Sequence, residues 1–304
     1  MAIKSKRFDY IFSNPPYNDN LDIKILHKII SISDEIIVVH PSTWLLDRKN
    51  KNATFKNFKV YLGKTLKEVK MFNGNPVFGI ELQVPIIITH ISNSHNNKTT
   101  CDYFGDKFIA NVFDITKFGN DWDMVKDFLV PVKKYINTHG SIHDYVDIAD
   151  FTLNKFSYAQ LATITGHVWA NKLEMSRPDH YTLVTKDANI ITGIRNSNHK
   201  NVYKFSTDYE RDNFIAYLQT KFTRFCLATM KVSLNNGGET INIPMMDFSQ
   251  EWDDNKLFDY FNVSDEMKEF IDNYIPSYHV SDFDVLQFMK NHKSVIKKLT
   301  NKDN

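Results

Sequence analysis

Apolar and polar positions in the first 95 residues alternate in a way that predicts one helix between two strands. Phe8 to Ser13 is a short run of strand-forming residues, and Leu21 to Ile32 carries apolar residues at helical spacing. Glu35 to Val39 is a β-branched run typical of a buried strand. Because the order is strand, turn, helix and strand, it predicts a βαβ unit with a parallel sheet. We therefore expect an α/β fold for this part of the chain.

A second apolar run follows a lysine-rich stretch. Val77 to Ile91, VFGIELQVPIIITHI, resembles a β-hairpin whose second arm is fully buried, so we expect antiparallel pairing to complete the sheet. Ser92 to Thr100 is polar and rich in turn formers, which indicates a surface loop. The pattern changes beyond this loop. We predict a domain boundary near residue 100, between residues 1–100 and a mixed α+β domain at 101–304 with a helical C-terminal tail.

The second part of the chain mixes β-prone runs with helical stretches. We expect an amphipathic helix around Trp122 to Tyr135, a helical stretch from Asp208 to Lys231 and short helices from Asp247 to Lys298. Short β-prone runs lie at Tyr181 to Thr185 and Asn201 to Phe205. A chain of 304 residues is long enough for two domains, since single cores stop growing near about 250 to 300 residues.

The first predicted strand ends in the tetrapeptide Asn14-Pro15-Pro16-Tyr17. Each proline restricts its own φ and pushes the residue before it to an extended conformation, so the Asn14 side chain and the Pro15 carbonyl should point in fixed directions. Together these two oxygens can accept both hydrogens of a planar exocyclic amine, which makes its nitrogen a better nucleophile. Tyr17 would offer a flat face for stacking, worth about 1 to 3 kcal/mol. Ligands of βαβ sheets bind beyond the carboxyl ends of the strands, where this motif lies.

The tetrapeptide resembles the motif of S-adenosylmethionine-dependent amino-methyltransferases that modify adenine N6 in DNA. Their signature is Asn or Asp, two prolines, and Tyr, Phe or Trp at a strand end, and Asn14, Pro15, Pro16 and Tyr17 match it. The resemblance implies a Rossmann-like methyltransferase sheet, S-adenosyl-L-methionine as cofactor and double-stranded DNA as partner. It also implies that the target adenine is flipped out of the duplex, because its amine is unreachable inside the base stack.

Later blocks of the chain are similar to the same family. EIIVVHPSTWLL resembles its next strand and loop, and NPVFGIELQVPIIITHI resembles its late hairpin, where an aromatic residue packs on the other face of the flipped base. Phe78 matches that aromatic residue, and Phe72 is its competitor. Phe205 to Leu227, Ile243 to Phe261 and Val263 to Ile275 resemble target-recognition domains of type II and type IIG restriction-modification adenine methyltransferases. The resemblance thus implies a partial methyltransferase catalytic domain at 1–100 and a target-recognition, DNA-binding domain at 101–304.

The cofactor motif of this family is absent from the sequence. S-Adenosylmethionine binding needs a glycine-rich turn after the first strand, because glycine allows a close backbone approach. The ten glycines form no Gly-x-Gly, and seven residues precede Phe8. Three interpretations stay open. The chain is the C-terminal product of a split gene that assembles with a second polypeptide carrying the cofactor-binding half, a truncated or degenerate remnant, or a DNA-binding protein that kept the target-recognition part.

These observations predict a site-specific DNA adenine-N6 methyltransferase, or the catalytic-motif and target-recognition part of a split one. The alternative is a non-catalytic DNA-binding subunit or remnant derived from such an enzyme. An intact Asn14 to Tyr17 motif favours retained chemistry, because a remnant freed from selection has no reason to keep it.

Basic residues gather in one stretch, although the whole chain is nearly neutral with 37 Lys and Arg against 36 Asp and Glu. Between Arg48 and Lys70, eight basic residues stand against one acidic residue, Glu68. Contact with DNA phosphates is one interpretation, and a solvated lysine-rich face is the other. Arginine also pairs commonly with guanine, which makes Arg177 and Arg195 candidate base readers. The residues we predict to bind DNA are Arg48, Lys49, Lys51, Lys56, Arg177 and Arg195.

Cysteine content and hydropathy exclude several other classes of protein. Cys101 and Cys226 lie far apart and in no metal-ligand spacing, which excludes a disulfide framework and a zinc ribbon. We expect no metal site. No window approaches the roughly 20 apolar residues that span a bilayer, so we expect a cytoplasmic protein without a membrane segment.

Overall fold

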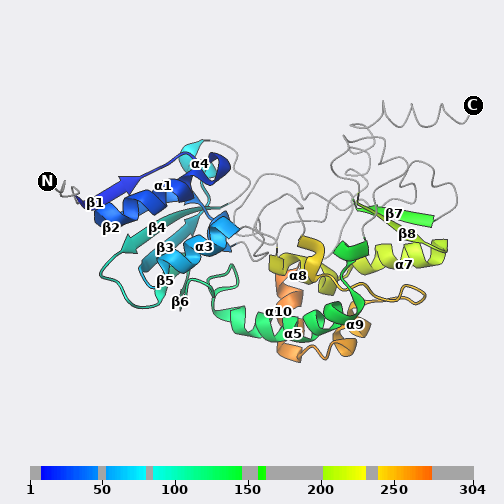
Figure 1. Ribbon diagram of the computed structural model, residues 1–304. Coiled ribbons are helices and arrows are strands. Elements are labelled where there is room, and N and C mark those ends of the chain that lie inside the picture. Colours follow the sequence, from blue (N-terminus) through cyan, green and yellow to red (C-terminus); the bar gives the residue numbers. More distant parts are fainter. Residues whose placement is uncertain are drawn as a thin grey trace, which may run out of the picture. The chain divides into compact units, whose positions relative to one another are not determined.

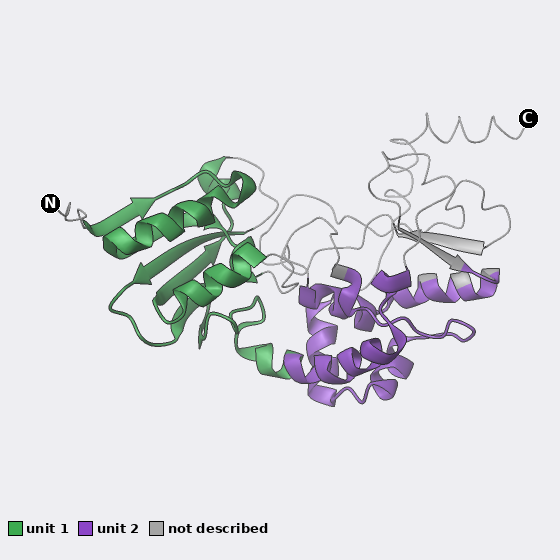
Figure 2. Ribbon diagram, in the orientation of Figure 1, with its two compact units in different colours: residues 1–125, 169–176, 232–234 green, residues 126–168, 177–231, 235–304 purple. Residues whose placement is uncertain are grey.

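The computed structural model describes residues 8–46, 53–79, 85–145, 157–161, 201–230 and 239–275. Its backbone contacts divide the chain into two compact units, drawn in green and purple in Figure 2. Along the described residues, the first unit runs to Val125 and the second begins at Lys126.

The first unit is built on a six-stranded mixed sheet (Figure 1). The strand order is β1-β2-β4-β3-β5-β6. β1 is parallel to β2, and β3 is parallel to β5, whereas β4 is antiparallel to both β2 and β3, and β6 is antiparallel to β5. The expected α/β class is confirmed at this level. The strands are β1 Phe8–Ser13, β2 Ser33–Pro41, β3 Leu66–Phe72, β4 Ile86–Ser92, β5 Thr99–Tyr103 and β6 Asp106–Ala110.

The predicted βαβ unit is confirmed. β1 has the expected bounds, helix α1 covers Leu21–Ile29, and a short 3₁₀ helix, η2 at Ile30–Ile32, leads into β2. The two strands pair in parallel, with Ser13 opposite Val38. Local apolar spacing was enough to predict this unit, because one helix and two strands that follow each other in sequence pack together directly.

The predicted hairpin over Val77 to Ile91 is wrong in its first arm. Asn75–Phe78 forms a short helix, α4, with Pro76 in its first turn and Gly79 at its end in the left-handed region at φ 65°. Proline at a helix start and glycine after its end both favour this turn over a strand. The second arm is the buried strand β4, as expected, and it pairs with β3 and β2 instead.

The first sheet continues past the boundary that we predicted near residue 100. β5 begins at Thr99 and pairs in parallel with β3, with Val69 opposite Cys101. β5 then turns through Phe104 and Gly105 into β6. Backbone pairing between distant parts of the chain therefore holds residues up to Ala110 in the first sheet.

One face of the sheet carries the hydrophobic core under α1 and α3, the second of which covers Ala53–Leu62. Side chains such as Ile36, Val38 and Val69 are completely buried there together with Leu26 of α1 and Phe58 of α3. The ring of His27 packs against Phe58 and Tyr61, which joins the two helices. This packing supports the sheet from one side.

The opposite face is exposed along β1. Tyr10 and Phe12 are 64% and 73% exposed, and their rings stack with centroids 6.5 Å apart. Phe8 points to the same face by strand alternation and is also exposed. β1 is the edge strand of the described sheet, so its outer side has no neighbouring strand among the described residues. An apolar edge strand of this kind is a surface that proteins normally cover or pair.

The second unit is mainly helical in its described part. The predicted strand at Asn201 to Phe205 is β8, which pairs antiparallel with β7. The predicted helical stretch from Asp208 is two helices that break at Thr220, and Asp254 caps the second of them by accepting from the backbone N–H groups of Lys221 and Phe222. The elements are α5 Trp122–His139, β7 Ser157–Leu161, β8 Asn201–Phe205, α7 Asp208–Gln219, α8 Lys221–Met230, α9 Asp254–Tyr260 and α10 Asp265–Tyr274.

Helix α8 forms the centre of the second unit. All of its residues after Lys221 are buried, and the ring of Phe128 on α5 packs edge-on against Phe222 and Phe225. None of the helices in the described ranges has both the length and the apolar character needed to cross a lipid bilayer.

Candidate active site

Asn14 to Tyr17 lie at the carboxyl end of β1, beside the carboxyl end of the parallel strand β2. Pro15 is buried and Tyr17 is half-buried, whereas Asn14 and Pro16 are exposed. The motif therefore anchors its backbone in the protein and presents the Asn14 amide to solvent. This end of a parallel pair is where ligands of open α/β sheets bind.

The side chains of Asn14 and Tyr17 contact each other directly. The Tyr17 hydroxyl donates to Asn14 Oδ1 at 2.5 Å, and the backbone carbonyl oxygen of Val39 lies 3.4 Å from the same hydroxyl. The first distance is typical of a strong O–H···O hydrogen bond, and the second is long. Two residues that we predicted to act together are thus joined by one hydrogen bond.

The Tyr17 hydroxyl keeps its proton at neutral pH. Partial burial raises its pKa above the usual value of 10.0, and the nearby charge of Asp22 raises the pKa further. Both effects disfavour the phenolate. Tyr17 is therefore a hydrogen-bond donor throughout the physiological range.

Behind the motif lies a buried polar network that sequence patterns did not predict. His40 on β2 is fully buried, and its Nδ1 lies 3.2 Å from Oδ2 of Asp22 in the first turn of α1. Its Nε2 lies 2.8 Å from Oγ1 of Thr89 on β4 and accepts from Trp44 Nε1 at 3.2 Å. An indole nitrogen only donates, so Nε2 is the unprotonated nitrogen and Nδ1–H donates to Asp22. The network links α1, β2 and β4.

The only sequence signal for this network was the apolar context of its members. His40 ends a β-branched run and Asp22 follows the apolar Leu21, both unusual positions for polar side chains. A polar residue at a buried position needs a partner. Asp22 and His40 are separated by 18 positions in the sequence, too far for a local pattern to predict that they pair.

The buried imidazole predicts a loss of stability in mild acid. Burial lowers the pKa of His40 below its usual value of 6.5, although the contact with Asp22 opposes this shift. In the unfolded chain His40 would protonate near pH 6.5, so between that pH and its lower native pKa the unfolded state binds more protons. Unfolding free energy should fall with pH there, by at most about 1.4 kcal/mol per pH unit. Denaturant unfolding at pH 7 and pH 5 measures the decrease in unfolding free energy. The decrease should be smaller for His40→Gln than for the parent. Equal decreases would contradict the role of His40.

The chain reverses direction between the motif and α1 through two residues in the left-handed region. Asp19 and Asn20 have φ of 53° and 59°. Asp and Asn tolerate this region better than other residues with a Cβ, because their short polar side chains interact locally. The two residues thus start α1 at Leu21 and bring Asp22 under the motif.

Phe78 and Phe72 lie at the same end of the sheet as Asn14. Phe72 is the last residue of β3 and pairs with Ile86. Pro41, the last residue of β2, pairs with the same Ile86, so the carboxyl ends of β2 and β3 lie at the same end of the sheet. Phe78 on α4 is 40% exposed and Phe72 is half-buried. Both remain candidates for the second stacking face, and Phe78 remains our prediction.

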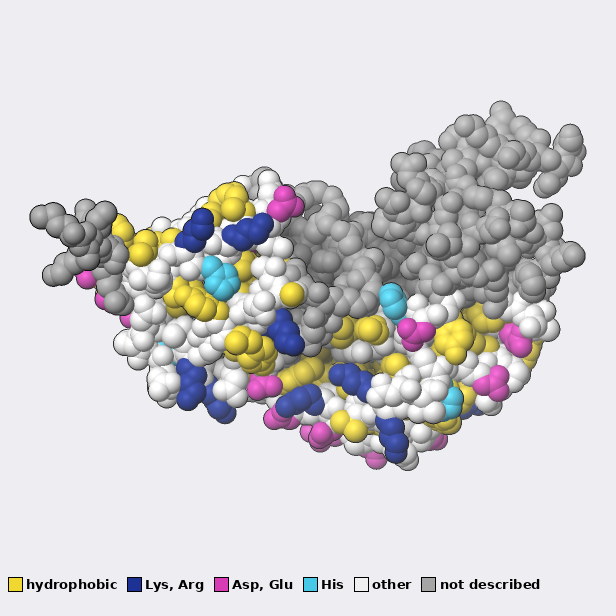
Figure 3. Space-filling model, viewed as in Figure 1, with side chains coloured by type: hydrophobic (Ala, Val, Ile, Leu, Met, Phe, Trp, Pro, Cys, Tyr) yellow, Lys and Arg dark blue, Asp and Glu magenta, His cyan; other side chains and the backbone are white. Residues whose placement is uncertain are grey.

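The predicted DNA contacts fall mostly outside the described residues. Lys56 is exposed on α3, whereas Arg48, Lys49, Lys51, Arg177 and Arg195 lie outside the described ranges. Lys59 from the same basic stretch is buried, and its Nζ donates to the carbonyl of Leu45 at 2.7 Å. Figure 3 presents the basic side chains of the first unit in small groups with hydrophobic and acidic side chains between them. Within the described part of the stretch, Lys59 therefore does not contribute to a basic surface.

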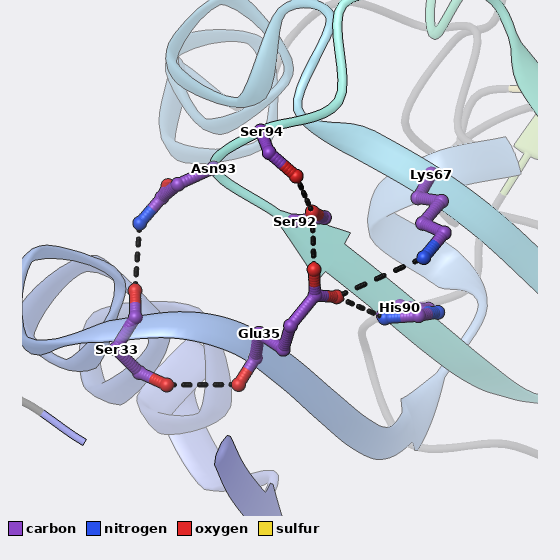
Figure 4. Close-up of polar contacts among 7 residues, drawn as sticks. All are labelled: Ser33, Glu35, Lys67, His90, Ser92, Asn93 and Ser94. Atoms are coloured by element: carbon purple, nitrogen blue, oxygen red, sulfur yellow. Dashed lines mark hydrogen bonds and ion pairs between the residues drawn. The ribbon is translucent and has the colours of Figure 1, made fainter. Parts of the chain in front are cut away.

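A second polar cluster surrounds Glu35, near the amino end of β2 (Figure 4). Its carboxylate contacts His90 Nε2 and accepts from Ser92 Oγ, both at 2.6 Å, and Lys67 Nζ lies 3.9 Å away. Burial opposes ionisation, but the hydrogen bonds from Ser92 and His90 outweigh it and lower the pKa of Glu35. Glu35 and His40 are five residue steps apart along β2, which corresponds to roughly 16 Å. The cluster joins β2, β3 and β4 and lies away from the candidate site.

The described residues do not fit the S-adenosyl-L-methionine site that the resemblance implies. The turn after β1 contains Asn-Pro-Pro-Tyr, and the turn after β3 contains a single glycine, Gly74, with φ −76°. Where the backbone approaches a cofactor closely, the turn needs glycines, because glycine adopts backbone conformations that other residues do not. No described turn that follows β1, β2 or β3 contains two glycines.

Comparison with known proteins gives matches among solved structures alone. No protein family and no curated protein matches the chain. Among solved structures, the chain is similar to the type IIG restriction endonuclease BpuSI, with a TM-score of 0.33 and 11% sequence identity. The match covers 97% of this chain and 53% of the other, so the chain spans about half the length of that enzyme.

Proposed function

We propose that Asn14 to Tyr17 bind the exocyclic amine of a flipped-out adenine, as the substrate half of a DNA adenine-N6 methyltransferase of restriction-modification systems. The observation that carries the proposal is the contact between Asn14 and Tyr17 at the carboxyl end of β1, where an exposed amide oxygen lies next to a half-buried aromatic ring. An amine acceptor beside a stacking face is what a planar amino base requires. The parallel pair of β1 and β2 supports a Rossmann-like sheet in this half.

Each residue of the motif has a separate role in this proposal. Asn14 Oδ1 and the Pro15 carbonyl accept the two N–H groups of the amine, which favours a pyramidal nitrogen whose lone pair is available for attack. Tyr17 stacks on the base, and Phe78 covers its other face. Pro15 and Pro16 fix the backbone, so the acceptors do not have to be ordered when the base arrives. The described residues hold the substrate and do not hold a methyl donor.

The methyl donor, S-adenosyl-L-methionine, would bind to a cofactor-binding half carried by a second polypeptide. The exposed edge strand β1, with Tyr10 and Phe12 on its open face, supports this part of the proposal. Strand addition at β1 would pair its backbone, and side chains of the added strand would flank its aromatic side chains. It would also bring the added half next to the carboxyl end of β1, where Asn14 lies.

Double-stranded DNA is the proposed partner. Lys56 and the basic residues outside the described ranges would contact phosphates, and the second unit would carry target recognition. Such contacts release counterions, so affinity should fall as salt is raised. Phosphate contacts carry no sequence information, so other residues must contact the bases. Arg177 and Arg195 are proposed for this role, because arginine commonly pairs with guanine.

The test compares two duplexes that differ at one base opposite an abasic position, with adenine in one and purine, which lacks the amine, in the other. A base without a pairing partner is extruded at low cost. We expect adenine to bind about tenfold more tightly, because two hydrogen bonds are lost with purine. Affinity is measured by fluorescence anisotropy at two salt concentrations. Equal affinities would contradict an amine site, and salt-sensitive binding without adenine preference would favour the non-catalytic DNA-binding alternative.

A further inference from the structure

The hydrogen bond between Tyr17 and Asn14 has a consequence for the orientation of the Asn14 amide. The side chain of Asn14 is exposed, and its amide can turn to present either Oδ1 or Nδ2 in one direction. Only Oδ1 accepts a hydrogen from an amine. An exposed, unrestrained asparagine would present the wrong group, or no group, for much of the time.

The hydroxyl of Tyr17 restrains this side chain through a contact with its oxygen. This hydroxyl donates to Oδ1 at 2.5 Å, and it remains protonated because burial and Asp22 both oppose ionisation. A hydroxyl can also accept, but its single hydrogen is directed to Oδ1, because the alternative acceptor, the Val39 carbonyl oxygen, lies 3.4 Å away and makes only a weak contact. The contact therefore favours Oδ1 over Nδ2 at this position. Since a carbonyl oxygen has two lone pairs, one remains for a second donor.

The Tyr17 ring is itself restrained. It is half-buried, and the Val39 carbonyl oxygen lies 3.4 Å from the hydroxyl on the side of β2. Val39 precedes His40, whose contacts with Asp22 and Thr89 hold that end of β2 against α1 and β4. The hydroxyl thus has a defined position from which to hold Asn14.

We propose that Tyr17 is a positioning residue as well as a stacking face: its hydroxyl holds Asn14 with Oδ1 ready to accept the amine of the target base. This inference rests on the proposed function of the motif. The inference gives the ring and the hydroxyl of Tyr17 different roles. The ring stacks on any base, whereas the hydroxyl, through Asn14, affects the binding only of a base that carries an amine. Phenylalanine would keep the first role and lose the second.

The experiment uses the full chain and the same adenine and purine duplexes. Tyr17→Phe should leave the affinity for the purine duplex within about twofold, because the ring still stacks. The affinity for the adenine duplex should fall about threefold, no more than with Asn14→Ala, because Asn14 must then be ordered on binding. Tyr17→Ala is the matched control and should weaken both duplexes. Binding to the purine duplex also reports that Tyr17→Phe is folded.

A double variant tests whether the hydroxyl acts through Asn14. In an Asn14→Ala background, adding Tyr17→Phe should change the adenine preference by less than about twofold, since no amide remains to be oriented. The inference is overturned if Tyr17→Phe keeps the parent preference, if it weakens both duplexes equally, or if it has its full effect without Asn14. A parent chain with no adenine preference would instead overturn the proposed function itself.

Discussion

Replacing Asn14 by alanine should abolish methyl incorporation into DNA while lowering the affinity for DNA by no more than about threefold. Asn14 Oδ1 is the exposed side-chain acceptor of the motif, and the Pro15 carbonyl cannot accept both hydrogens of the amine alone. Loss of one positioned group at a reacting centre lowers turnover by about 100-fold or more. Most DNA affinity comes from phosphate contacts, which Asn14 does not make in this proposal.

Two measurements check the Asn14→Ala prediction. Tritiated methyl incorporation is assayed with the chain alone and together with any polypeptide that is found to supply the proposed cofactor-binding half. Binding of the adenine and purine duplexes is measured with the chain alone, where the adenine preference should fall from about tenfold to about threefold. Asn18→Ala, an exposed asparagine beside the same loop, is the control and should behave like the parent. An unchanged methylation rate or adenine preference would remove the acceptor role.

Replacing Asp22 by alanine should destabilise the first unit by about 2 to 3 kcal/mol. The change leaves the buried His40 Nδ1–H without its acceptor, which costs about 1 to 3 kcal/mol. It also removes a carboxylate from the first turn of α1, where the helix dipole favours negative charge by about 0.3 to 1 kcal/mol. The loss is large against a total stability of about 5 to 15 kcal/mol for a typical protein.

Amide hydrogen exchange of β2 is the suitable measurement for Asp22→Ala, because it reports on the first unit separately from the second. Asp22→Asn is the matched control. Its side-chain oxygen still accepts from Nδ1–H, so most of the stability should return. Asp9→Ala, an exposed change on β1, should stay within about 0.5 kcal/mol of the parent. If Asp22→Asn is as destabilised as Asp22→Ala, the stability comes from the charge of Asp22 and not from its hydrogen bond, which would contradict the prediction.

Elements made from neighbouring residues were predictable. β1, α1 and β2 follow from apolar spacing, and the ends of β1 and β8 agree with the predicted runs. Helix α5 was predicted around Trp122 to Tyr135 and extends to His139. In each case the residues that decide the conformation lie within one or two turns of each other.

Strand pairing was harder to predict. The run before β4 contains an apolar stretch that suggests a hairpin arm, yet Pro76 and Gly79 make it a helical turn. β4 then inserts between β2 and β3, and β5 joins the far side of β3. These pairings depend on backbone groups that are distant in sequence, which alternation of apolar residues does not specify.

The candidate site also combines features that the sequence predicts with features that it does not. The sequence by itself determined the tetrapeptide Asn14 to Tyr17, its strand before and its helix after, because prolines and apolar spacing act locally. Only the tertiary structure decided that the Tyr17 hydroxyl holds Asn14, that Lys59 turns inward, and that Asp22 pairs with His40 under the motif. The physical reason is that a side-chain hydrogen bond depends on the direction of two groups in space, and their direction follows from packing around them, which no local pattern encodes.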